Sequence, residues 1–248
     1  MTKIKSLYTI KKKTSGRDSQ GHVSVRHRGG EQKRFLRQID WLRTKTIPAV
    51  VAVIEYDPNR TADIALLVYQ DGTKSYILAP SNLKVGDTVL SGNNAPIKDG
   101  NCLSLKNIPL GVAIHALEFV PGSGAQLIKS AGAAAFVQSV DGDRAIVKLP
   151  SGEIRYFSAN CRATIGQVGN QDLMNQKLTK AGQNRHRGIR PTVRGVAQHP
   201  DSHPHGGGEG RSSIGMNPKT PWGKPAMGKR TRKLKKMSNR LIISRRKK

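Results

Sequence analysis

Short hydrophobic segments separated by turns fill the middle of the chain. Between residues 49 and 121, β-branched and aliphatic residues gather in five segments: 49–57, 64–70, 74–79, 88–91 and 110–120. Asp71-Gly72, between the second and third segments, suits the positive φ angles of a tight hairpin turn. Five short strands with turns between them predict a small closed β-barrel.

A second series of the same kind follows the Pro-Gly-Ser-Gly joint at residues 121–124. Residues 125–168 alternate β-rich segments with turns at 141–143 and 150–152. They predict a second all-β unit of about 45 residues, which is small enough to need support from its neighbours.

Other predicted elements are few. Residues 172–180 can form about two helical turns, with Asn170 as the N-cap and Gly182 past the C-terminal end. Residues 22–27 alternate enough for a short strand, and residues 241–243 predict a brief strand or an apolar anchor.

Residues 185–211 follow neither the helical nor the strand period. They hold five arginines, four histidines and six glycines, with prolines that interrupt regular structure. The glycine run at 206–208 lets a partner approach the main chain. Such a segment cannot bury enough apolar surface to offset its ordering entropy, so we expect a partner to order it.

Charge indicates what that partner is. The chain has 248 residues and a formal net charge of +27. Residues 1–48 hold 13 basic and 3 acidic side chains, and residues 169–248 hold 20 and 3, whereas the centre is nearly neutral. Two basic flanks predict a polyphosphate partner, because each neutralised phosphate releases counterions. Without a run of about 18 apolar residues or a signal-peptide pattern, we expect no membrane partner.

These patterns divide the chain into four parts. We predict a basic arm at 1–48, a first barrel at 49–121, a second β unit with a short helix at 122–182, and a basic extension at 183–248. In the arm, basic residues are interleaved with potential stacking groups such as His27, Phe35 and Trp41. That mixture suits RNA, where arginine and aromatic planes stack on exposed bases.

The sequence offers little support for an enzyme or a metal site. Cys102 and Cys161 lie far apart and outside any CxxC spacing, which excludes a zinc ribbon. His199, His203 and His205 sit in a glycine-rich loop without a rigid frame, so their spacing is a weak metal signal. Since no nucleophile, oxyanion donor or Walker loop accompanies them, we expect no catalytic residues and no cofactor of the protein's own.

Several motifs resemble one known family. They include EYDPNR (55–60), YILAP (76–80), IPLG (108–111), GSGAQLIKSAG (122–132), CRATIGQVGN (161–170), RGIRPTVRGVAQHPDSHPHGGGEGR (187–211) and TPWG (220–223). Nearly the whole chain from about residue 20 resembles bacterial-type large-subunit ribosomal protein two, also written ribosomal protein L-two.

This resemblance implies a mainly β fold, with an OB-like barrel followed by an SH3-like barrel and long, basic, irregular extensions. It implies a structural rRNA-binding protein near the peptidyl-transferase region. Its expected partners are large-subunit rRNA, neighbouring ribosomal proteins and the small subunit across a bridge. The expected location is a cytoplasmic ribosome, with an organellar ribosome as the alternative. A non-ribosomal RNA chaperone built on the same barrels is the competing hypothesis.

The predicted rRNA-binding residues come from both flanks and the second β unit. They are Arg26, Arg28, Arg34, Arg37, Arg155, Arg162, Arg185, Arg187, Arg190, Arg194, His203, His205, Gly206, Gly207, Gly208, Arg211, Trp222, Lys229, Arg230 and Arg232. Arg155 and Arg162 enter because the resemblance implies that the barrels contact rRNA as well.

Overall fold

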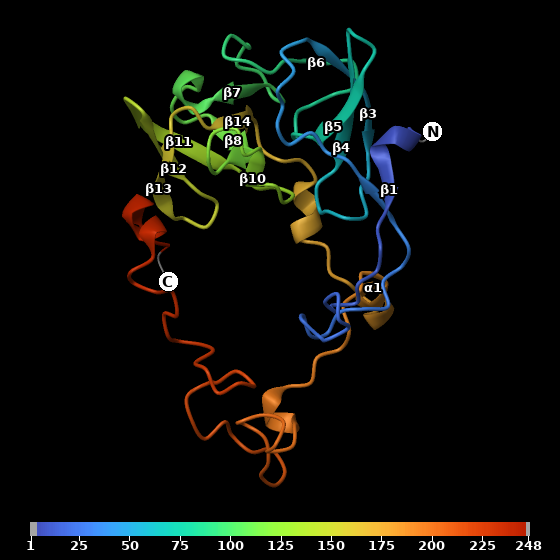
Figure 1. Cartoon of the computed structure of the whole chain (residues 1–248), viewed down its shortest axis with the longest axis vertical. Helices are drawn as coiled ribbons and strands as arrows, with labels where there is room; N and C mark the ends of the chain where they lie inside the picture. The colour runs from blue at the N-terminus through green and yellow to red at the C-terminus, as the bar shows by residue number, and fades with distance from the viewer. Residues whose placement is uncertain (1–3, 247–248) are drawn as a thin grey trace. The chain divides into compact units, whose positions relative to one another are not determined.

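The computed structural model describes residues 4–246, which divide into two units. We call residues 12–33 and 178–239 the basic unit, and the rest of the described chain the β unit. The β unit holds all the named strands (Figure 1). The basic unit holds α1 (Ala181–His186) and is otherwise mostly irregular.

A four-stranded antiparallel sheet forms the first half of the β unit, in the order β5-β4-β3-β6. Its strands are β3 (Ala49–Glu55), β4 (Ile64–Tyr69), β5 (Lys74–Leu78) and β6 (Thr88–Val89). The predicted hairpin at Asp71-Gly72 is confirmed, since Gly72 has a φ of 77° and β4 pairs with β5. Both faces of β4 are covered by apolar clusters, which explains its unbroken hydrophobic run.

A seven-stranded sheet follows in the order β15-β13-β12-β11-β8-β14-β7. Its strands are β7 (Cys102–Ser104), β8 (Ala113–His115), β11 (Ala135–Asp141), β12 (Arg144–Lys148), β13 (Ile154–Ser158), β14 (Arg162–Ile165) and β15 (Ile242–Ser244). Two short pairs complete the strands: β1 (Tyr8–Ile10) with β2 (Phe35–Arg37), and β9 (Leu117–Glu118) with β10 (Ala125–Leu127).

Register shifts in β3 and β11 accompany the curling of the two larger sheets (Figure 1). Each sheet encloses its own apolar core, with Val51 and Leu67 fully buried in the first and Ile114 and Val147 fully buried in the second. The fold is therefore mainly β, and its two curled sheets fit the OB-like and SH3-like barrels that the resemblance implied.

The sheet pairing changes one predicted boundary. Residues 102–118 belong to the second series, because β7 and β8 both pair with β14. The sequence pattern assigned them to the first barrel, since a run of short strands carries no sign of which sheet each strand joins. The first barrel therefore ends before residue 102.

The predicted helix at 172–180 is wrong. Residues Gln171–Met174 form the 3-10 turn η3, and the α-helix begins later, at Ala181. Asn170 does not cap a helix, because it has a left-handed φ of 61° and its side-chain amide donates to the Thr61 carbonyl at 2.8 Å. Gly182 lies inside α1 rather than beyond its end.

The predicted strand at 22–27 is also wrong, because Val23 makes only an isolated bridge to Arg17 and His27 has a positive φ of 58°. The remaining short elements are 3-10 turns, and sequence reasoning identified none of them. They are η1 (Lys5–Leu7), η2 (Leu105–Asn107), η4 (Gly195–Ala197) and η5 (Met237–Leu241).

Both segments of the basic unit leave the β unit and return to it. Residues 12–33 connect β1 to β2, which pair with each other. Residues 178–239 lead into β15, which confirms the strand predicted near 241–243 and pairs with β13. Each basic segment is therefore a loop held at both ends, which lowers the entropy lost when it is ordered.

A buried histidine makes the stability of the β unit sensitive to acid. His115 in β8 is 1% exposed, and its Nδ1 donates to the Gly166 carbonyl at 2.8 Å. Burial lowers the pKa of His115 to about 4, against an ordinary value near 6.5. Protonation therefore favours the unfolded chain.

We expect this residue alone to cost about 3 kcal/mol of stability as the pH falls from 6.5 to 4, with no effect above 6.5. Denaturant unfolding measured across that range checks the expectation. The His115→Gln variant should lose less stability than the wild type over the same interval, and equal losses would contradict it.

Candidate nucleic-acid interface

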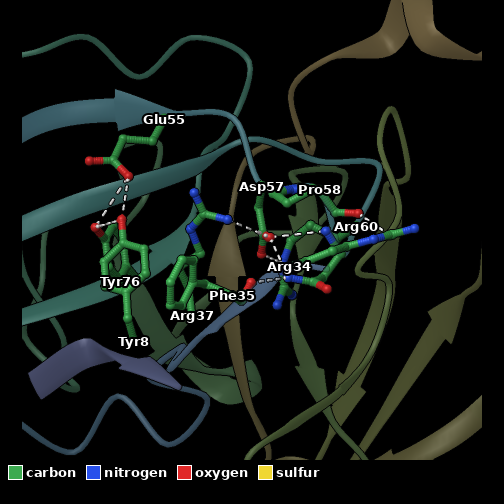
Figure 2. Close-up of polar contacts among 10 residues, drawn as sticks. Tyr8, Arg34, Phe35, Arg37, Glu55, Asp57, Pro58, Arg60 and Tyr76 are labelled. Atoms are coloured by element: carbon green, nitrogen blue, oxygen red, sulfur yellow. Dashed lines mark hydrogen bonds and ion pairs between the residues drawn. The ribbon is translucent and has the colours of Figure 1, made fainter. Parts of the chain in front are cut away.

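A buried carboxylate organises the basic side chains at the start of the β unit (Figure 2). Asp57, in the turn after β3, is fully buried. Its carboxylate accepts hydrogen bonds from Arg60 Nε at 2.6 Å and Arg37 Nη1 at 3.3 Å, and also from Asn59. Burial alone would raise the pKa of Asp57, but the hydrogen bonds from Arg60 and Asn59 outweigh it and lower that pKa.

The same turn holds β2 in place. Arg34 Nη1 donates to the Pro58 carbonyl at 2.6 Å, and Asn59 Nδ2 donates to the Phe35 carbonyl at 2.6 Å (Figure 2). Two predicted rRNA contacts, Arg34 and Arg37, therefore use some of their N–H donors in hydrogen bonds within the protein. The Arg37 side chain is only 15% exposed.

Tyr8 anchors the neighbouring strand β1. Its hydroxyl donates to Glu55 Oε2 at 3.0 Å and lies 3.0 Å from the Tyr76 hydroxyl (Figure 2). Burial, with the neighbouring Tyr8 and Glu55, raises the pKa of Tyr76. The β1–β2 pair is thus fixed to the first sheet by polar contacts at both ends.

Sequence reasoning missed a cluster of cations around Trp41. Arg60 Cζ lies 5.5 Å from the centre of the Trp41 ring, and Lys129 Nζ lies 4.6 Å from it. Trp41, Arg60 and Lys129 lie far apart in the sequence, so no local pattern predicts that they come into contact. Two partly exposed cations therefore contact one partly exposed ring, and Arg60 also pairs with Asp57.

The two predicted contacts in the second sheet differ in exposure. Arg155 is 8% exposed, with its guanidinium 4.8 Å from the Phe119 ring and 5.1 Å from the Phe157 ring. Arg162 is exposed, and its Nη1 donates to the Arg43 carbonyl at 3.3 Å. Arg162 is therefore the better placed of the two to reach RNA.

In the basic unit, two segments distant in the sequence lie antiparallel. Gly29 N–H donates to the Gly188 carbonyl and Arg190 N–H donates to the His27 carbonyl, each at 3.0 Å. Arg28 and Ile189 form a bridge between them. Gly188 has a φ of 86°, and a Cβ there would lie 2.9 Å from the Glu31 Cβ, so the pairing favours glycine at this position.

Five of the predicted arginines lie in or beside these two paired segments, with Arg185 in the last turn of α1. All five side chains belong to exposed residues: Arg26, Arg28, Arg185, Arg187 and Arg190. We call this set the arginine ribbon. The sequence selected its members but gave no indication that they come together.

The glycine run at 206–208 serves the protein's own packing. A Cβ on Gly206 would collide with the Gln198 and His199 carbonyl oxygens, and one on Gly207 would lie 2.9 Å from the Pro200 ring. Gly207 N–H donates to the Gln198 carbonyl at 3.2 Å. Glycine is thus required here by the protein itself. The approach of RNA to Gly206, Gly207 and Gly208 stays a prediction.

The two predicted histidines of this loop have different environments. His203 is 8% exposed, and its Nδ1 accepts the His205 N–H at 3.1 Å. His205 Nε2 accepts the Lys219 N–H at 2.7 Å, so the neutral ring carries its proton on Nδ1. The two rings lie 5.1 Å apart. The loop therefore fixes both imidazoles through backbone donors.

The remaining predicted contacts are exposed. Trp222 is 73% exposed. The others are Arg194, Arg211, Lys229, Arg230 and Arg232. Among residues 4–246, no three candidate metal ligands come together, and no helix in that range is long and apolar enough to cross a membrane.

Comparison with protein families identifies the family of the chain. A family model described as Ribosomal Proteins L2, RNA binding N-terminal domain, matches residues 4–91, and one described as Ribosomal Proteins L2, C-terminal domain, matches residues 98–223. The chain belongs to the ribosomal protein L2 family. The gap between the two matches precedes β7, in agreement with the sheet pairing.

Membership in the L2 family confirms the resemblance found in the sequence. It makes the chain a structural, RNA-binding protein of the large ribosomal subunit and places it in the ribosome. The L2 family is a structural RNA-binding family rather than a family of classical enzymes.

Proposed function

We propose that this L2-family protein holds large-subunit rRNA near the peptidyl-transferase region and supports association with the small subunit. The arginine ribbon is the observation that carries the proposal. Five exposed arginines in or beside two paired segments can neutralise phosphates from more than one stretch of RNA.

The mechanism is positional. Arginine and lysine side chains neutralise phosphates where RNA segments crowd together, and exposed Trp222 offers a ring on which a base can stack. The chemistry of peptide-bond formation belongs to RNA in this account. The protein acts without a cofactor of its own, and Mg²⁺ or K⁺ enter only as rRNA-associated ions.

The partners follow from that position. We propose large-subunit rRNA, neighbouring ribosomal proteins and, across a bridge, the small subunit. The proposed location is a cytoplasmic ribosome, and an organellar ribosome offers the same contacts.

Sedimentation of cell extracts tests the assignment. We expect the tagged full-length protein to sediment with large subunits and to remain with them through a high-salt wash, because its contacts are distributed over both basic segments. A protein that leaves the subunits in the wash, and is found in free RNA complexes, would contradict the proposal and favour an RNA chaperone.

A further inference from the structure

The eight-residue segment richest in positive charge lies just before β15. Six of the eight residues from 229 to 236 are lysine or arginine. Such a run normally remains extended and mobile, because like charges repel each other and no buried apolar surface offsets the loss of conformational entropy. Here it ends in a hydrogen-bonded turn.

Asn239 closes that turn with both ends of its side chain. Its Oδ1 accepts a hydrogen bond from Arg232 Nε at 2.7 Å, and its Nδ2 donates to the Lys233 carbonyl at 3.1 Å and to the Leu234 carbonyl. Its backbone N–H donates to the Lys236 carbonyl at 2.9 Å. Arg232 Nη2 also donates to Ser238 Oγ at 2.7 Å.

After Asn239, which lies in η5, the chain continues directly into β15. In that strand Ile242 pairs with Arg155 and Ser244 pairs with Ile154 of β13. The basic run is therefore closed by the side-chain amide of Asn239. Three residues after Asn239, the chain enters a strand that belongs to a sheet. Neither Asn239 nor Ile242 carries charge, so neither adds to phosphate neutralisation directly.

We propose that Asn239 and β15 position the basic run 229–236 for binding to rRNA. This inference rests on the proposed function. Preorganisation raises affinity by reducing the entropy lost on binding, without adding a contact. Arg232 keeps donors for phosphate, because a guanidinium has five N–H groups and, among residues 4–246, its hydrogen bonds come from Nε and Nη2. Asn239 is a positioning residue in this scheme.

The test compares two uncharged substitutions in the full-length protein. Asn239→Ala removes the turn contacts, and Ile242→Pro removes a β15 backbone donor and disfavours the strand. We expect each to weaken binding to in vitro transcribed large-subunit rRNA roughly tenfold at fixed salt. The slope of log affinity against log salt should stay at the wild-type value, because no cation is lost.

Three controls make the outcome decisive. Asn94→Ala changes an exposed asparagine of the β unit and should bind like the wild type. Ile242→Val preserves the strand, so its affinity for rRNA should equal that of the wild type. Thermal unfolding of Asn239→Ala should match the wild type, which excludes global loss of the fold. Wild-type affinity in both Asn239→Ala and Ile242→Pro would overturn the inference, whereas failure of the wild type itself to bind rRNA would overturn the proposed function.

Discussion

Truncation after residue 182 should weaken binding to large-subunit rRNA by roughly 10³-fold or more near physiological salt. The deletion removes 18 basic side chains and only two acidic ones, Asp201 and Glu209. Each lost phosphate contact reduces the slope of log affinity against log salt by about 0.7 to 0.9. We therefore expect a slope several units shallower, measured by filter binding or fluorescence anisotropy across a salt series.

A charge-only variant separates lost contacts from lost structure. Replacing the five members of the arginine ribbon by Gln leaves the chain length, β15 and the glycine loop unchanged. The slope should fall by about four if each arginine contacts one phosphate. Replacing exposed Lys74, Lys84 and Lys106 in the nearly neutral centre should change it little. An unchanged slope in both the truncated and the charge-only proteins would contradict the proposed role of the basic unit.

The Asp57→Ala variant should lower the free energy of unfolding of the β unit by about 3–5 kcal/mol. Removal of the carboxylate leaves Arg37 and Arg60, with side chains only 15% and 18% exposed, without their shared partner. It also removes the acceptor of the Asn59 hydrogen bonds. Denaturant unfolding followed by circular dichroism measures the loss.

Asp87→Ala is the matched control, because Asp87 is exposed and its carboxylate accepts a hydrogen bond from the Lys84 backbone. We expect this variant to lose much less stability than Asp57→Ala. Since the pKa of Asp57 is lower in the folded protein, its contribution is complete above the ordinary carboxyl pKa and is lost as the pH falls through the folded value. Equal losses in the two variants would show that the buried network adds nothing specific.

Local sequence patterns predicted the elements whose signals are local. The Asp71-Gly72 hairpin follows from turn chemistry, and the strand near residues 241–243 follows from a short apolar run within a basic segment. The helix at 172–180 was misplaced because Asn170 adopts a left-handed conformation and bonds to Thr61, more than 100 residues away in the sequence. Helix propensity is a local property of the sequence and cannot predict a contact between such distant residues.

In the candidate site too, local signals could be predicted from the sequence and long-range contacts could not. Residue type alone led to the expectation that Arg28, Arg185 and Arg190 contact RNA, because a guanidinium suits phosphate recognition, and that expectation stays a prediction. Pairing of residues near 28 with residues near 189 is a long-range event that no local period encodes. No local pattern predicts that Arg155 is buried against the Phe119 and Phe157 rings, since both rings reach it through tertiary packing.

Crosslinking of the assembled large subunit, with each crosslink mapped to a protein residue and an rRNA nucleotide, shows directly which parts of the chain lie on rRNA. We expect crosslinks to concentrate in residues 12–33 and 178–239, with the arginine ribbon joined to rRNA near the peptidyl-transferase region. Crosslinks confined to the two sheets, with both basic segments bound to other proteins or left unreacted, would contradict it.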